Sequence, residues 1–366
     1  MNIEKNRAFG ALITRLIQKQ SLTRQESKDA FTEMFKNEVS EMQQGAFLAA
    51  LNAKGETADE VAGSWEAIYE IDTHKVRLSE DIVVVENSGT GMDTFKTFNI
   101  STAASLIASA GGICMARHGA RAITSKCGTV DMAEALGVDV ECDADIVAKS
   151  IETAGIGLFN GMSPKIHPMA LGRILSQICF GSTLNIAASL ANPAMPKIAV
   201  RGVYSKTMIR PVIEVMKVIG FERALVVHGT IDGTDKGMDE ASVCGTTWCS
   251  ELSADGTIRD YKFRPEQFSM DCHGSTAIAP DSNIHNEPRR FVSLIQGKES
   301  GARKDSAVLN AALIYYVAGK AKTIEDGIEQ AAKSLEKNLA FDALACWVKA
   351  QNREPETGLQ RLSRLI

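Results

Sequence analysis

Apolar residues in the first seventy or so positions recur at the spacing of amphipathic helices. One such face, at positions i, i+3, i+4, i+7 and i+8, carries Phe9, Leu12, Ile13, Leu16 and Ile17. Two further helices are predicted by capping boxes, in which a threonine precedes a glutamate by three residues, at 23–26 and 57–60. We therefore expect a helical subdomain over residues 1–75. Its apolar faces require a partner, either the rest of the chain or a second copy.

The pattern changes near residue 80, where short aliphatic runs begin to alternate with helical stretches. These runs lie at 82–85, 198–200 and 224–227, and each leads into glycine. Such alternation predicts an α/β domain with a mainly parallel sheet over residues 76–366, completed by C-terminal helices. The polar, weakly periodic stretch from about 250 to 303 is expected to be irregular or strand-rich.

Composition and charge narrow the function classes. The chain is 45% hydrophobic and 23% charged, as is ordinary for a soluble globular protein, and its net charge of -5 argues against a nucleic-acid-binding role. It shows neither a membrane-length apolar run nor a secretory signal, so a cytoplasmic protein is expected. The eight cysteines form no CxxC pair and are expected to be reduced core thiols.

The strongest chemical feature is a glycine pair directly after the first aliphatic run, in Gly89-Thr90-Gly91-Met92-Asp93. Without Cβ atoms, glycines let backbone N–H groups approach an anion closely. The helix that follows begins with Asn99-Ile100-Ser101-Thr102, which offers hydroxyls and unpaired backbone donors to the same anion. The pair is followed neither by the third glycine of a dinucleotide fingerprint nor by the Gly-Lys-Ser/Thr of a P-loop. A generic phosphate-binding turn is predicted.

Two further segments favour a multiply charged phosphate ligand. The stretch 117–129 places Arg117, Arg121 and Lys126 among hydroxyls and glycines. The adjacent carboxylates of Asp239 and Glu240 lie on a loop, where they are suited to Mg²⁺ bridging to a phosphate.

Together these motifs resemble the anthranilate phosphoribosyltransferase family. The matching stretches are GTGMD (89–93), NIST (99–102), RHGARAITSKCGTVDMAEALG (117–137), NP (192–193), VVHG (226–229), GMDEAS (237–242) and NAALIYYVAGKA (310–321). They occur in order along nearly the whole chain. The resemblance implies that phosphoribosyl pyrophosphate binds in the hinge between a helical subdomain and an α/β domain, with part of the 165–190 segment packing on the helices. It also implies a homodimer formed through the helical subdomain.

The resemblance also implies roles for individual residues. Those expected to bind the donor are Gly89, Thr90, Gly91, Asp93, Asn99, Ser101, Thr102, Arg117, Lys126 and Cys127. Mg²⁺ is expected to be held by Ser101, Asp239 and Glu240. Arg117 stands where the family usually has lysine, so it keeps the charge but presents a planar fork.

The acceptor side departs from the family pattern. The residues expected there are His118, Ala120, His167 and Arg173. The family's His-Gly-Asn is His118-Gly119-Ala120 here, and the segment between His167 and Asn185 is shorter by about two residues. Arg173 is the nearest counterpart of the family arginine that pairs with the acceptor carboxylate.

Three functions remain open from the sequence. The first is transfer of ribose 5-phosphate to a small aromatic nitrogen acceptor, with anthranilate favoured. The second is a phosphoribosyltransferase or phosphorylase reaction on another aromatic amine or a nucleobase. The third is a non-catalytic nucleic-acid-binding relative, which the carboxylates of Asp93, Asp239 and Glu240 disfavour because they repel a phosphate backbone. A hydrolase triad is not supported, because the chain has no G-x-S-x-G elbow.

Overall fold

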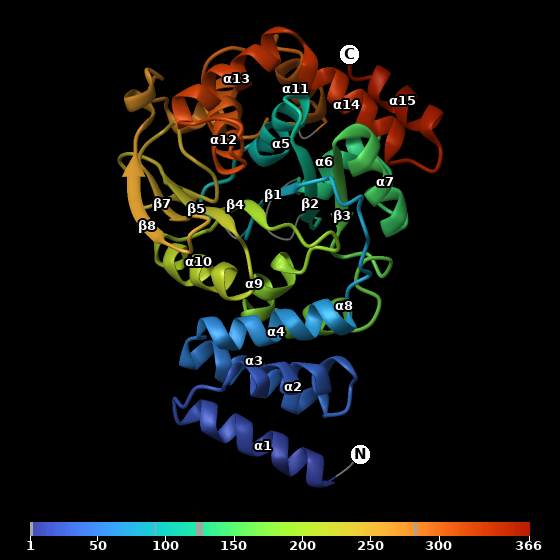
Figure 1. Cartoon of the computed structure of the whole chain (residues 1–366), viewed down its shortest axis with the longest axis vertical. Coiled ribbons are helices and arrows are strands. Elements are labelled where there is room, and N and C mark those ends of the chain that lie inside the picture. The colour runs from blue at the N-terminus through green and yellow to red at the C-terminus, as the bar shows by residue number, and fades with distance from the viewer. Residues whose placement is uncertain (1–2, 92, 122–126, 282, 284) are drawn as a thin grey trace.

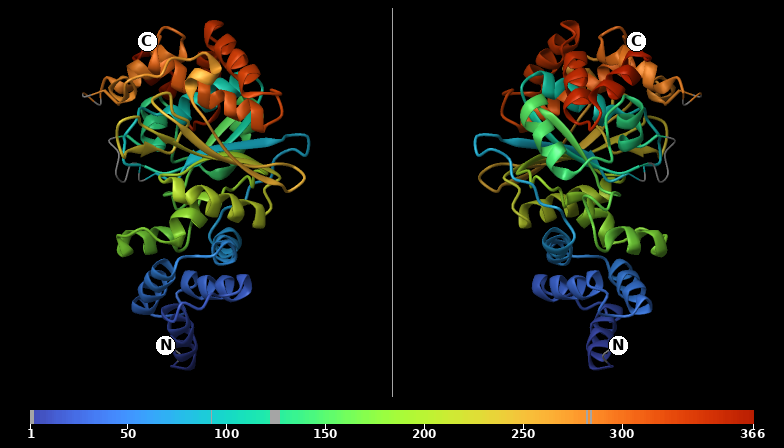
Figure 2. Two further views of the ribbon diagram at one scale, coloured as in Figure 1. Left: turned by 90° about the vertical axis from the view of Figure 1, so that its left-hand side faces the viewer. Right: turned by 90° about the vertical axis from the view of Figure 1, so that its right-hand side faces the viewer.

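The computed structural model describes residues 3–91, 93–121, 127–281, 283 and 285–366. Four helices open the chain and form the narrow end of the molecule (Figures 1 and 2). They are α1 (Ile3–Ile17), α2 (Arg24–Phe35), α3 (Glu41–Lys54) and α4 (Ala58–Ile71). Both predicted capping boxes are confirmed, since Thr23 caps α2 with Glu26 and Thr57 caps α4 with Glu60.

The wide end is an α/β domain built on one sheet with the strand order β3-β2-β1-β4-β5-β7-β8, with β6 paired to β5 (Figure 1). Strands β1 to β5 are parallel, and β6, β7 and β8 are antiparallel additions at one edge. The strands are β1 (Val84–Gly89), β2 (Cys114–Gly119), β3 (Ile156–Asn160), β4 (Ile198–Gly202), β5 (Arg223–Thr230), β6 (Gly237–Met238), β7 (Thr247–Leu252) and β8 (Ile258–Phe263). The predicted α/β class with a mainly parallel sheet is confirmed.

Helices cover both faces of this sheet, so each face has its own hydrophobic core (Figure 2). The helices of the α/β domain are α5 (Ile100–Ala110), α6 (Thr129–Ala135), α7 (Ala144–Ala154), α8 (Leu171–Ile178), α9 (Thr183–Leu190), α10 (Ile209–Val218), α11 (Glu287–Ile295), α12 (Ala302–Val317), α13 (Ile324–Glu336), α14 (Leu339–Ala350) and α15 (Pro355–Ser363). On β5, Leu225 and Val227 pack into the core that holds α5 and α12, whereas Ala224 and Val226 pack into the core that α10 shares with the N-terminal helices. This alternation is the period of a strand buried on both faces.

The stretch from 250 to 303 contains more regular structure than its sequence suggests. It holds the β7–β8 hairpin, two short 3-10 helices (Pro265–Phe268 and Ser275–Ile278) and α11. The expectation of an irregular or strand-rich segment is therefore wrong for α11. This helix begins at Glu287 with a proline in its first turn and buries Phe291 and Leu294 against the sheet-covering helices. None of the described helices is long and apolar enough to cross a membrane.

Candidate active site

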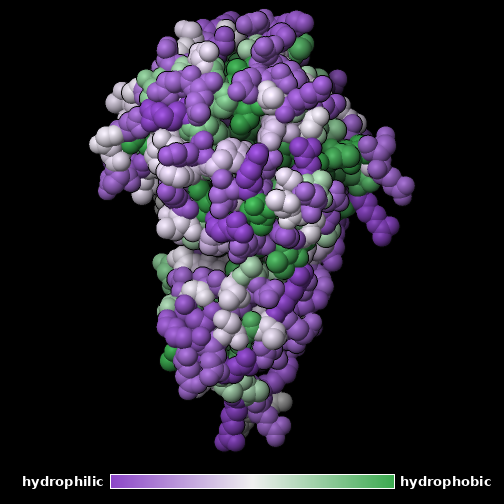
Figure 3. Space-filling view, turned by 60° about the vertical axis from the view of Figure 1, so that its left-hand side comes forward, coloured by the Kyte–Doolittle hydropathy of each residue, from purple (hydrophilic) through white to green (hydrophobic). Residues whose placement is uncertain are grey.

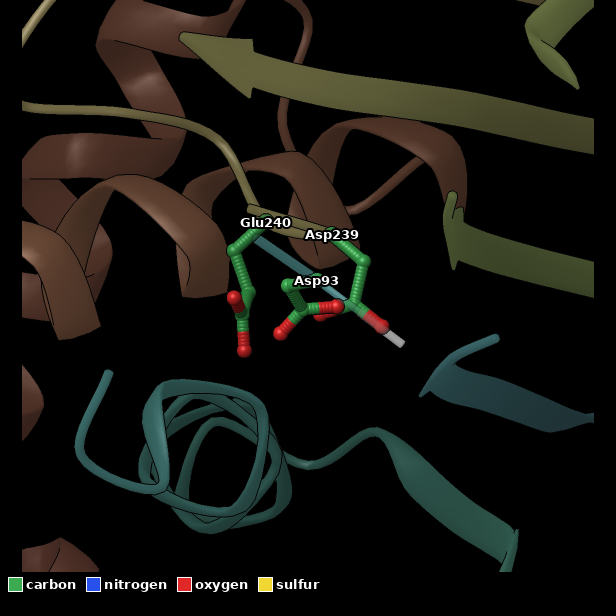
Figure 4. Close-up of side chains that lie close together, drawn as sticks. All are labelled: Asp93, Asp239 and Glu240. Atoms are coloured by element: carbon green, nitrogen blue, oxygen red, sulfur yellow. The ribbon is translucent and has the colours of Figure 1, made fainter. Parts of the chain in front are cut away.

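Three carboxylates from two distant segments meet at the end of the parallel strands. Asp93 lies in the loop after β1, and Asp239 and Glu240 directly follow β6. One oxygen from each lies within 4.8 Å of the others, and Figure 4 shows the three side chains turned toward one another. The predicted convergence of the glycine loop with the acidic pair is therefore present in the fold.

Close backbone approach makes this convergence possible. The N–H of Gly91 donates to Oδ2 of Asp239 at 2.9 Å. A Cβ at Gly89 would lie 1.9 Å from the same oxygen, and one at Gly202, the last residue of β4, would lie 1.5 Å from the backbone carbonyl oxygen of Asp239. Both positions therefore require glycine, because any side chain would displace Asp239.

Further hydrogen bonds fix the two loops to one another and to the C-terminal helices. Thr94 Oγ1 accepts from the N–H of Gly237 at 2.9 Å, and the N–H of Phe95 donates to the Gly237 carbonyl at 3.0 Å. The side chain of Asn310 on α12 exchanges two hydrogen bonds with the backbone of Ala241. The acidic pair is thus held rigidly from both sides.

The carboxylates are crowded in a way that favours a cation. Burial, and then the charge of Asp239, raise the pKa of Asp93 to about 8. The same two causes, in the same order, raise the pKa of Glu240 well above its usual range. Within the described residues, Oδ1 of Asp93 and Oε2 of Glu240 are buried without a hydrogen-bond partner. A hard divalent cation would supply the missing partner and relieve the repulsion, so the residues fit a magnesium ion.

The first turn of α5 faces this cluster. Ser101, predicted to hold Mg²⁺, donates its hydroxyl to Oε1 of Glu240 at 3.2 Å. Asn99, at the N-cap of α5, donates from its side chain to the carbonyl of Cys127 at 3.4 Å. This bond joins the 117–129 stretch to the start of α5. Thr102 is fully buried.

Arg117, predicted to bind the donor, is buried on β2 and bonded to β1 and α5. Its side chain is 1% exposed, and it donates to Oγ1 of Thr102 at 2.9 Å and to the carbonyl of Asn87 at 3.3 Å. Burial lowers the pKa of this guanidinium to about 10, while Glu86 and Glu240 oppose the fall. The geometry indicates that Arg117 joins the end of β1 to the first turn of α5.

The other cations of the second loop are placed differently. Arg121 binds the carboxylates of Asp131, Glu134 and Glu141 at 2.8 to 3.2 Å, which commits it to α6 and its surroundings. Lys126, predicted to bind the donor, lies outside the described residues. Ala120, predicted on the acceptor side, accepts from the N–H of Val130 at 3.4 Å.

The two histidines predicted near the acceptor form a buried pair. Their Nε2 atoms are 3.1 Å apart, and Nδ1 of His167 faces the carbonyl of Asp72. The pKa of His118 is lowered to about 3 by burial, by the neighbouring His167 and then by Arg201, while the nearby Ser189 carbonyl opposes this fall. Burial also lowers the pKa of His167. Both rings are therefore neutral at pH 7.

The hydrogen-bond partners determine the tautomers of this pair. Nδ1 of His167 must carry a proton in order to donate to the Asp72 carbonyl, so its Nε2 is an acceptor. His118 then donates from Nε2, which leaves its Nδ1 as a bare lone pair. In the described structure this atom is buried without a partner.

Arg173 points toward the helical subdomain. It donates to Oε1 of Gln44 and to the carbonyl of Met34, each at 3.0 Å. These bonds join α8 to α2 and α3. The expected role of Arg173 in holding an acceptor carboxylate stays a prediction, and its partners indicate a structural role instead.

Two buried charged residues went unnoticed in the sequence. Glu86 on β1 and Arg201 on β4 are each 1% exposed and lie among apolar strand positions. A charge inside an aliphatic run was the available signal, because such residues are rarely buried unless they are paired or functional. Ser88 lies opposite Arg201 in the β1–β4 register and accepts a hydrogen bond from it.

Comparisons with known proteins agree with this architecture. Residues 81–341 match the family model described as the α/β domain of a glycosyl transferase family, and residues 11–70 match its helical bundle domain. The anthranilate phosphoribosyltransferase of Anaeromyxobacter dehalogenans is 34% identical over 340 residues, covering 92% of this chain and 97% of its own. That of Rubrobacter xylanophilus is 36% identical over 335 residues, covering 91% and 94%.

Solved structures share the fold. The crystal structure of anthranilate phosphoribosyltransferase from Thermus thermophilus superposes with a TM-score of 0.82 at 28% identity, covering 93% of this chain and 99% of that one. The Saccharomyces cerevisiae enzyme, solved in complex with phosphoribosyl pyrophosphate and Mg, gives a TM-score of 0.82 at 20% identity, with coverage of 94% and 98%.

Proposed function

Because the chain belongs to the anthranilate phosphoribosyltransferase family, we propose that it transfers ribose 5-phosphate from phosphoribosyl pyrophosphate to the nitrogen of a small aromatic acceptor, with anthranilate as the favoured substrate. The observation that carries the proposal is the meeting of Asp93, Asp239 and Glu240 beside the glycine loop. A glycine loop next to a carboxylate cluster suits a metal-bridged diphosphate.

In this proposal the donor binds across the loop 89–93 and the first turn of α5. Backbone N–H groups of the loop and of the helix N-terminus would contact the diphosphate. Thr90 and Ser101 would add hydroxyl groups, and Cys127 would lie at the edge of the donor through its contact with Asn99. Arg117 would act indirectly, by holding Thr102 and the end of β1 in place.

Asp93, Asp239, Glu240 and Ser101 would hold Mg²⁺, as their crowding and unpaired oxygens favour. When bound, the ion would neutralise charge on the diphosphate leaving group. The protein residues would bind and orient the donor so that C1 of the ribose faces the acceptor.

The reaction then requires little acid–base chemistry. The bond from C1 to pyrophosphate breaks as positive charge develops on the ribose ring, in an oxocarbenium-like state. Fixed N–H donors stabilise the charge that builds on the leaving group. Alignment of the acceptor nitrogen with C1 supplies much of the remaining acceleration, and no residue acts as a nucleophile.

A homodimer formed through the helical subdomain is part of the proposal. Large apolar side chains are exposed there, including Met42 at 85% and Ile17 at 67%. On the face drawn in Figure 3, hydrophobic residues occur in scattered groups among hydrophilic ones. Light scattering should give twice the monomer mass, and Met42→Glu combined with Ile17→Glu should shift the protein toward the monomer.

The test of the proposed function is acceptor-dependent release of pyrophosphate. Phosphoribosyl pyrophosphate and Mg²⁺ would be incubated with anthranilate, other aromatic amines, nucleobases or no acceptor. Turnover with anthranilate supports the proposal. Turnover with a nucleobase alone would support the second function, and nucleic-acid binding without any turnover would support the third.

A further inference from the structure

A buried polar cluster lies on the acceptor side, next to the histidine pair. It consists of Glu86 and Ser88 on β1, His118 on β2 and Arg201 on β4, and these three strands are adjacent in the order β2-β1-β4. Arg201 donates to the hydroxyls of Ser88 and of Ser189, the latter on α9. The cluster therefore lies between the sheet and α9. The resemblance assigns an acceptor role to His118 alone, and neither the sequence motifs nor the comparisons assign one to Glu86, Ser88 or Arg201.

Three atoms of this cluster are buried without a hydrogen-bond partner among residues 3–91, 93–121, 127–281, 283 and 285–366. They are Nε of Arg201, Oε2 of Glu86 and Nδ1 of His118. An unpaired buried donor or acceptor is costly, so three on adjacent strands indicate a place where a polar ligand would complete the bonding.

The charge of Arg201 acts on both halves of the active site. It is attracted by Glu86 and, more weakly, by Asp239 of the carboxylate cluster, and it disfavours protonation of His118. Arg201 also directly precedes Gly202, whose carbonyl accepts from the N–H of Thr90 in the glycine loop at 3.0 Å. An acceptor held by Arg201 would therefore lie close to the donor loop.

We infer that Arg201 binds the carboxylate of an aminobenzoate acceptor, while the unprotonated Nδ1 of His118 accepts a hydrogen bond from the amine of that acceptor. The inference rests on the proposed function and names the residue that selects its substrate. An ortho-aminobenzoate offers one carboxylate anion and one amine that can donate, which complements a guanidinium donor beside a neutral imidazole acceptor.

Two other arginines, Arg173 and Arg117, already have hydrogen-bond partners. Arg173 donates hydrogen bonds to α2 and α3, and Arg117 donates hydrogen bonds to Thr102 and Asn87. Arg201 alone among these three combines a free donor with a position beside the histidines. Because Arg201 is 1% exposed, an acceptor can reach it only after neighbouring side chains move.

The test compares anthranilate with aniline, which keeps the amine and lacks the carboxylate. In wild-type protein kcat/KM should favour anthranilate. Arg201→Gln should lower kcat/KM for anthranilate by about 100-fold, the loss expected for a charge-assisted hydrogen bond, while kcat/KM for aniline and the KM for phosphoribosyl pyrophosphate change little. Arg201→Lys should recover part of the preference. Arg210→Gln, an exposed arginine on α10, is the matched control and should behave as wild type.

Loss of Arg201 removes the largest effect that holds down the pKa of the buried Glu86. The double variant Glu86→Gln with Arg201→Gln is therefore measured in parallel. If both variants keep the wild-type preference for anthranilate, the inference is overturned. It is overturned equally if Arg173→Gln abolishes the preference and Arg201→Gln does not. A wild-type protein that turns over neither amine contradicts the proposed function itself. The assignment of Arg201 is then also contradicted, because it rests on that function. Turnover of anthranilate with unaffected Arg201 variants contradicts only the assignment.

Discussion

Individual glycines decide whether the carboxylate cluster can form. At Gly89 the space that a Cβ would occupy is already filled by the side chain of Asp239, with Oδ2 at 1.9 Å and Cγ at 2.4 Å. Gly45 in α3 has no heavy atom within 4 Å of the same position. The two sites thus separate a steric requirement from the general effect of removing a glycine.

Gly89→Ala should therefore push Asp239 out of the cluster and weaken Mg²⁺-dependent binding of phosphoribosyl pyrophosphate by tenfold or more, about the loss from one displaced charged ligand. Gly45→Ala should leave binding unchanged and raise the free energy of unfolding by up to about 1 kcal/mol, because alanine favours a helix. Titration calorimetry and urea unfolding measure the two effects. Equal donor affinity in Gly89→Ala and wild type would show that the contact is dispensable.

Glu86 makes stability depend on pH in a defined direction. Burial raises its pKa to about 7, against the opposing effects of Arg201 and others, from 4.5 in the unfolded chain. Between these values the native state holds a proton that the unfolded state has lost, so stability falls as pH rises through this window.

From pH 5 to pH 8 the contribution of Glu86 to the free energy of unfolding should fall by about 3 kcal/mol. Glu86→Gln should remove that part of the pH dependence. Urea unfolding of both proteins at the two pH values, without Mg²⁺, gives the difference directly, since Asp93, Asp239 and Glu240 contribute equally to each protein. A variant with the wild-type pH dependence would show that Glu86 is not the responsible group.

Helix ends position the residues that are proposed to bind the acceptor. The carboxylate of Asp72, at the end of α4, accepts from the backbone N–H groups of Met169, Ala170 and Leu171 at the start of α8. Its carbonyl faces His167. One residue therefore joins the helical subdomain, α8 and the histidine pair.

Asp72→Ala should lower the free energy of unfolding by about 2 kcal/mol, since it removes a buried cap from three N–H groups. It should also raise KM for the acceptor more than KM for the donor, because α8 and His167 shift together. Asp29→Ala on the exposed face of α2 serves as control, with an expected change within about 0.5 kcal/mol. If both variants lose the same stability, the capping role is disproved.

How far the sequence predicts these elements depends on whether their signals are local. The capping boxes at 23–26 and 57–60 were predicted correctly because each lies within one turn of chain. Helix α11 was missed because its apolar positions lie inside a long polar stretch. The bonding of Arg201 to Ser88 could not be predicted, since it depends on β1 and β4 becoming neighbours across more than a hundred residues.

At the scale of the whole molecule, the site exists because the carboxyl ends of the parallel strands all lie on the same side of the sheet. The loop after β1 and the segment after β6 come from opposite halves of the chain, and β4 lies between β1 and β5 to bring them together. The sequence motifs pointed to this meeting only through their resemblance to a known family. Their spacing along the chain does not determine it, because strand order sets which loops meet.

The most direct measurement is calorimetric titration of phosphoribosyl pyrophosphate into wild-type protein and into Asp239→Asn with Glu240→Gln, each with and without Mg²⁺. Asp255→Asn, an exposed carboxylate in the β7–β8 turn, is the control. The double variant should remain folded, since it removes charges that repel one another. We predict Mg²⁺-dependent binding in the wild type and the control, and its loss in the double variant. Donor binding with the same Mg²⁺ dependence in all three proteins would contradict the account.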